Sequence, residues 1–218
     1  GWATSISAGP SDESGQAFNF IVSNDNNGLF SAQPAVSAAG DLTYTPAGNA
    51  NGSSVVSVAI HDNGGTANGG VDTSAPQTFV IAVSAMNDPP VITLPGPTVN
   101  YTENDPPAIL DATATVSDPD SPNFDGGVMT IEFSTGGTAD DRLTVGHQGV
   151  APAEVGVSGT TITFGGTSVG ETSGGVGGSS PLMITFNVSA TPAAAQAVLR
   201  RILFSNVSAT PAEGLRTV

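Results

Sequence analysis

The chain has 218 residues with Lys+Arg 4 and Asp+Glu 19, which gives a formal net charge of −15. All four basic residues are arginines, cysteine is absent and histidine occurs twice. An acid excess of this size excludes binding along a nucleic-acid backbone or on an anionic lipid surface, because both depend on Lys and Arg. Without cysteine there is no disulfide, thiolate nucleophile or Cys-ligated zinc.

Short segments in which β-branched and aromatic residues alternate with polar ones recur along the chain. Gly, Pro, Asn, Asp or Ser bound each segment, as is typical of strands joined by turns. The predicted strands are residues 17–22, 42–45, 55–60, 78–83, 91–94, 128–133, 160–164 and 183–188. This spacing predicts an all-β fold made of two tandem Greek-key, immunoglobulin-like β-sandwiches.

A proline-stiffened link, Met86-Asn87-Asp88-Pro89-Pro90, separates the two predicted domains, residues 1–88 and 89–218. Asn or Asp before Pro favours a turn, and the prolines offer no N–H to a sheet. Few residues precede the turn at Asp12, and Leu215–Val218 resembles the start of a strand. We therefore expect the first domain to lack its first strand and the second its last. The chain begins with Gly rather than Met, which suggests an excised or processed part of a longer polypeptide.

One segment favours a helix. Thr191 is a good N-cap, Pro192 suits the first helical position, and helix-forming residues continue to Arg201. We expect a short helix near residues 192–201. No segment is long and apolar enough for a transmembrane helix.

Oxygen-bearing side chains gather around the link. Asn87 and Asp88 lie within it, Glu103 follows the next strand, and Asp118 and Asp120 form an i, i+2 pair in the following turn. Strands of about six residues carry the chain from one end of a sandwich to the other. The link and the turn after the second strand can therefore meet, and several oxygens meeting there suit Ca²⁺. The alternative is a set of solvated acids and turn-capping side chains.

A second possible metal site is the glycine-rich hairpin between Asp62 and Asp72. It supplies two carboxylates but lacks the ligand spacing and the closing Glu of an EF-hand. A plain surface hairpin is the stronger interpretation.

Enzymatic activity is not expected. Gly166-Thr167-Ser168-Val169-Gly170 matches the G-x-S-x-G pattern, but that motif needs a following helix and a later histidine, and both His61 and His147 precede it. The neighbouring acids Asp140 and Asp141 should point apart, which does not suit a glycosidase pair. We predict no catalytic residues.

Three segments resemble, in order, the elements that close a cadherin repeat. Ile60–Gly64 is similar to A-x-D-x-G, Phe79–Val83 to V-x-I-x-V, and Ala85–Pro90 to D-x-N-D-x-x-P. Tyr101–Asn104 and Val116–Asp120 are similar to the Glu-Asn strand and the aspartate pair that open the next repeat. The resemblance covers most of the chain and is most specific at the link.

The family in question is the cadherin-like repeats of large bacterial surface and secreted proteins, which Asp41–Pro46 also resembles. The resemblance implies an interdomain Ca²⁺ site at Asn87, Asp88, Glu103, Asp118 and Asp120. Three departures weaken it. Ala85 replaces an acidic ligand, Asn49 and Asn51 stand where animal cadherins have a central acidic motif, and the helix near 192–201 is not a usual cadherin feature.

Together these features predict a structural or adhesive repeat module of a large extracellular or cell-surface bacterial protein, stiffened by Ca²⁺ at the junction. Its partners would be neighbouring repeats, and other surface proteins or glycans. One alternative is a carbohydrate- or protein-binding module that uses residues 64–72 or 165–180, although the chain has few aromatic residues. Another is a filament subunit completed by a strand from a neighbouring copy.

Overall fold

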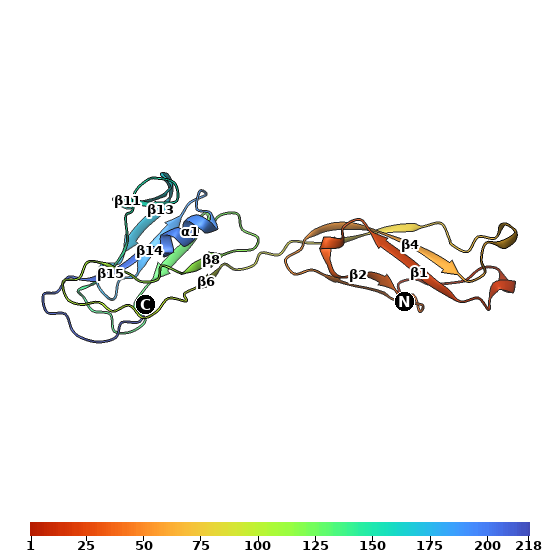
Figure 1. Cartoon of the computed structure of the whole chain (residues 1–218), viewed down its shortest axis with the longest axis horizontal. Coiled ribbons are helices and arrows are strands. Elements are labelled where there is room, and N and C mark those ends of the chain that lie inside the picture. Colours follow the sequence, from red (N-terminus) through yellow and green to blue (C-terminus); the bar gives the residue numbers. More distant parts are fainter. The chain divides into compact units, whose positions relative to one another are not determined.

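The computed structural model describes all residues from 1 to 218. The chain divides into two compact units, Gly1–Met86 and Asn87–Val218, so the division falls inside the predicted link. Antiparallel strands dominate both units, and the one α-helix belongs to the second (Figure 1). That helix is far too short to cross a bilayer, and no other segment forms a helix that could.

The first unit contains two antiparallel sheets. Its strands are β1 (Phe18–Asn24), β2 (Phe30–Val36), β3 (Leu42–Pro46), β4 (Gly52–Asp62) and β5 (Gln77–Val83). Short 3₁₀ turns lie at Ser11–Glu13, Asn27–Leu29 and Ala67–Gly69. One sheet has the order β1-β4-β5, and β2 pairs with β3 in the other.

The core of the first unit joins these two sheets. Phe30 from β2 clusters with Val56 and Val58 from β4 and Ile81 from β5, all of them buried. Alternate residues of β4 point the other way, so Val55 is 42% exposed beside the fully buried Val56. This period-two burial is what the alternating sequence predicts for a strand with one face in a core.

The second unit has ten strands and one helix. These are β6 (Val91–Thr93), β7 (Ala108–Ile109), β8 (Thr115–Ser117), β9 (Val128–Ile131), β10 (Asp141–Val145), β11 (Val155–Ser158), β12 (Thr161–Phe164), β13 (Thr167–Gly174), β14 (Leu182–Phe186), α1 (Pro192–Leu199) and β15 (Ile202–Asn206). They form a five-stranded sheet β11-β12-β13-β14-β9, a three-stranded sheet β10-β15-β7 and the pair β6-β8. All of the strand pairs are antiparallel.

The helix begins as the sequence predicts. The Thr191 hydroxyl accepts a hydrogen bond from the Ala194 N–H at 3.2 Å, and Pro192 occupies the first turn. The Gln196 side chain accepts from the Val116 N–H at 3.2 Å, which ties α1 to β8. Val198 from the helix joins a core with residues from all three sheets, such as Ile184 on β14.

All eight predicted strands are present, with ends shifted by a few residues. One prediction is wrong: residues 165–180, offered as a binding loop, contain β13, which lies between β12 and β14 within the five-stranded sheet. Its glycines mark close packing rather than flexibility, because a Cβ on Gly170 would run into the Thr185 carbonyl oxygen of β14.

Candidate metal site at the end of the β6–β8 pair

The pairing of β6 with β8 brings two of the predicted acids together. Val91 lies opposite Ser117 in this antiparallel pair. If the same register is extended three residues before Val91 and three residues after Ser117, Asp88 lies opposite Asp120. The structure has this contact, since the Asp88 N–H donates to the Asp120 carboxylate at 2.9 Å.

Asp118 organises the turn that carries Asp120. One of its carboxylate oxygens accepts from the Ser121 N–H at 3.0 Å and from the Asp120 N–H at 3.2 Å. Partial burial raises the pKa of Asp118, but the hydrogen bonds from Ser121 and Asp120 outweigh that effect and hold the pKa below its usual value. Asp118 is therefore a carboxylate at neutral pH, with its second oxygen available.

Asn87 completes the group on the side of the link. Its side-chain amide donates to the Asp88 carbonyl at 2.9 Å, which fixes the amide beside the Asp88 backbone and leaves the amide oxygen free. Asn87, Asp88, Asp118 and Asp120 thus lie together at one end of the β6–β8 pair. Asn87 and Asp120 are exposed, and the other two side chains are partly buried.

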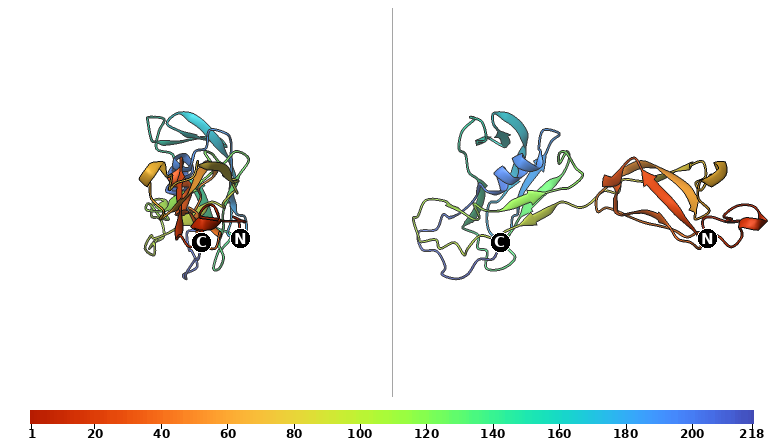
Figure 2. Two further views of the ribbon diagram at one scale, coloured as in Figure 1. Left: turned by 90° about the vertical axis from the view of Figure 1, so that its right-hand side faces the viewer. Right: turned by 45° about the vertical axis from the view of Figure 1, so that its right-hand side comes forward.

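Glu103 lies elsewhere. It belongs to the turn from Tyr101 to Asp105, where the Tyr101 hydroxyl donates to the Asp105 carbonyl at 2.9 Å. The Tyr101 ring packs on Phe204 of β15 with ring centroids 5.0 Å apart. This turn therefore precedes β7, whereas Asp118 follows β8, and Figures 1 and 2 show the two turns at opposite ends of the second unit. We expected Glu103 at the same end as the link, but the chain continues past β6 to the far end of the unit before β7 and β8 return.

The residues present thus fit a Ca²⁺ site only in part. Four of the five predicted residues lie near one another at this end of the β6–β8 pair, and their side chains carry the oxygen ligands that Ca²⁺ prefers. No set of three or more Asp, Glu, His or Cys side chains is arranged here to hold an ion as the structure stands. Further ligands would have to come from backbone carbonyls, water or rotated side chains.

The hairpin proposed as a second metal site uses its two carboxylates locally. One Asp62 oxygen accepts from the Gly64 N–H at 2.7 Å. The Asp72 carboxylate accepts from the Thr73 hydroxyl at 3.0 Å and lies 3.7 Å from the His61 ring. The backbones of Asp62 and Asp72 are hydrogen bonded at 2.9 Å, but their two carboxylates contact different neighbours.

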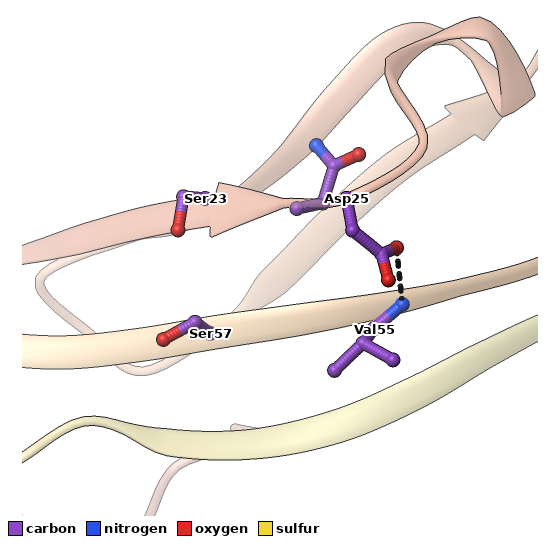
Figure 3. A pocket seen from close by; sticks show the side chains of 5 residues that line it. Ser23, Asp25, Val55 and Ser57 are labelled. Carbon is purple, nitrogen blue, oxygen red and sulfur yellow. Dashed lines mark hydrogen bonds between the residues drawn. The ribbon is translucent and has the colours of Figure 1, made fainter.

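A shallow hollow of about 350 Å³ lies on the first unit, over β1 and β4. Figure 3 shows its lining residues, with Asp25 accepting from the Val55 N–H at 2.8 Å and the Ser23 and Ser57 side chains close by. Ser23 and Ser57 are register partners on these strands. No aromatic ring lines the hollow, so it offers no stacking surface for a sugar.

Similarity searches add no relative from which a role can be transferred: no protein-family model, no curated protein and no solved structure matches the chain.

Proposed function

We propose that the chain is a structural and adhesive repeat module of a large extracellular bacterial protein, and that Ca²⁺ binds at Asn87, Asp88, Asp118 and Asp120. One observation carries the proposal: the hydrogen bond between Asp88 and Asp120, which joins the link to the turn after β8. The sequence resemblance to cadherin-like repeats implies a metal at these four positions and at Glu103. The bacterial surface location rests on that resemblance alone.

The chemistry of the site favours a hard cation. Asp88, Asp118 and Asp120 are three acidic residues at one end of the β6–β8 pair, and no Lys or Arg forms an ion pair with any of them. Ca²⁺ takes six to eight oxygens in loose geometry, so carboxylates on turns, an amide and water suit it better than they suit Mg²⁺. Binding would fix the link against the Asp118 turn.

The proposed architecture is two Greek-key sandwiches in series. It is supported by a separate apolar core in each unit, to which strands from more than one sheet contribute. The prolines at 89 and 90 keep the chain extended as it enters the second unit. A row of such modules, each tied at its link by an ion, would form a stiff spacer, and its partners would be the neighbouring repeats.

Isothermal calorimetry with a chelator-treated sample tests the proposal. We expect heat on adding Ca²⁺, and a Ca²⁺-dependent rise in melting temperature. Extracellular Ca²⁺ modules bind with Kd near 10⁻⁴–10⁻³ M, and a tenfold excess of ion over Kd stabilises the folded state by about 1.4 kcal/mol. Absence of both signals would reject calcium binding.

Two variants locate the ion. Asp120→Asn removes a carboxylate from the convergent group and should weaken binding at least several-fold. Glu103→Gln is the matched control, because this exposed acid lies in the turn before β7 and should leave Ca²⁺ affinity unchanged. Equal effects of the two variants would mean that the ion does not sit at the β6–β8 end.

A further inference from the structure

A buried carboxylate, Asp141, holds the C-terminal segment of the second unit. Asp141 is the only acidic residue in the buried core, and its side chain is 0% exposed. One oxygen accepts from the Asn206 amide at 2.7 Å. The other accepts from the Thr138 N–H at 2.7 Å and from the Arg216 Nε at 3.3 Å.

Arg216 is the only arginine that forms an ion pair with a carboxylate, although the chain has 19 acidic residues. The only other side chain paired with a carboxylate is that of a histidine, His61. Arg142 and Arg200 instead donate to backbone carbonyls. A buried charge without a partner is strongly destabilising. The segment that carries Arg216 therefore stabilises the fold, because Arg216 neutralises the buried Asp141 carboxylate.

The next residue pairs with the segment that follows β9. Thr217 forms an isolated antiparallel bridge with Thr135, four residues after the end of β9. Its carbonyl accepts from the Ser134 N–H at 2.7 Å, and its N–H donates to the Thr135 carbonyl at 3.0 Å. The two threonine hydroxyls are 3.1 Å apart. The backbone edge of Ser134–Gly136 thus accepts an antiparallel partner outside the five-stranded sheet.

A glycine makes room for the same segment. Gly136 has φ +77°, and a Cβ on it would collide with the Leu215 carbonyl oxygen. Leu215 itself is 75% exposed, so the segment is held by its backbone and by Arg216 rather than by apolar burial. Three neighbouring features therefore contact residues 215–217: the buried Asp141 carboxylate, the backbone edge at Thr135, and Gly136, which has no side chain.

We propose that Asp141 and the edge Ser134–Gly136 form a strand-binding notch that recognises an extended segment by its arginine, and that Leu215–Val218 occupies this notch in cis. The ligand class is an extended peptide with arginine followed by a β-branched residue. The planar guanidinium suits the carboxylate, and the next residue sets the antiparallel register. The proposal does not depend on calcium.

The lowered pKa of Asp141 agrees with the geometry. Burial raises the pKa, but the hydrogen bonds from Asn206 and Thr138 and the charge of Arg216 together outweigh burial. With Arg216 in place, Asp141 is therefore charged at neutral pH.

Chemical rescue of Arg216→Ala in the full chain tests the notch. We expect its melting temperature to fall by about 10 °C, because the buried Asp141 loses its partner. Millimolar methylguanidinium should restore part of the loss and methylammonium should not. A labelled peptide with the sequence of residues 213–218 should bind this variant, and the same peptide with alanine in place of arginine should not bind.

Two controls keep the test decisive. Asp141→Asn combined with Arg216→Ala removes the charge that attracts the guanidinium, so neither methylguanidinium nor the peptide should act on it. In this cysteine-free chain, Thr135→Cys with Thr217→Cys should form a disulfide and hold the segment in place even when Arg216 is replaced. Equal rescue by methylammonium, rescue of the double variant, or an unchanged melting temperature for Arg216→Ala would each overturn the proposal.

Discussion

The strongest test of the fold of the second unit is a pair of substitutions on adjacent residues of β14. Ile184 is fully buried between β13 and β9, whereas Met183 points to the other face and is 39% exposed. Ile184→Ala removes three buried carbon atoms, which costs about 2.4 kcal/mol at about 0.8 kcal/mol each. A residual cavity adds up to about 2 kcal/mol, depending on how far the neighbours relax.

We therefore expect Ile184→Ala to lower the free energy of unfolding by about 3–4 kcal/mol and the melting temperature of the second unit by about 10 °C. Met183→Ala removes as many heavy atoms from a partly exposed position and should cost less than about 1 kcal/mol. Urea titration followed by circular dichroism measures both. A Met183→Ala loss equal to that of Ile184→Ala would refute the register of β14, because a one-residue slip exchanges the two faces.

Three further predictions concern local features. Thr191→Ala removes the N-cap of α1 and should lower the free energy of unfolding of the second unit by about 1 kcal/mol in a urea titration. Thr191→Ser keeps the hydroxyl and should be close to the wild type. An equal loss for both variants would contradict the cap. Gly175→Ala should lower the melting temperature more than Gly159→Ala. Both positions have positive φ, but only a Cβ on Gly175 would meet a carbonyl oxygen, that of Leu143. Thermal melts that rank the two variants the other way would contradict the packing. The folded-state pKa of Asp141 lies below the unfolded value of about 3.9, so its contribution to stability is complete above that value and is lost as pH falls through the folded pKa. Asp141→Asn should therefore flatten the dependence of stability on pH below about 4. An unchanged pH dependence in the variant would contradict this.

Strand-forming residues bounded by turn residues were enough to predict eight of the fifteen strands. The segment from Val55 to Ile60 is rich in β-branched residues, and β4 contains it. The cap and proline at Thr191 and Pro192 predicted α1, because both act locally. Residues 165–180 were misjudged, because glycine is typical of loops and also of tightly packed strands, and only the neighbouring strand β14 decides between the two.

The candidate site was predicted in part for a similar reason. Asp88, Asp118 and Asp120 are joined by one strand pair of known direction, so their convergence follows from the order of strands. Glu103 depends on where the chain goes after β6, which no local pattern encodes. The role of Asp141 could not be predicted either, because a buried acid and its arginine lie 75 residues apart in sequence.

Electron density from crystals grown with and without Ca²⁺ would show directly whether an ion binds at the β6–β8 end. We expect one ion beside Asp88, Asp118 and Asp120, with about seven oxygen ligands at about 2.4 Å and an anomalous signal that disappears in chelator. Ordered turns with water alone at saturating Ca²⁺, or an ion bound at Glu103 and not at Asp118, would contradict this expectation.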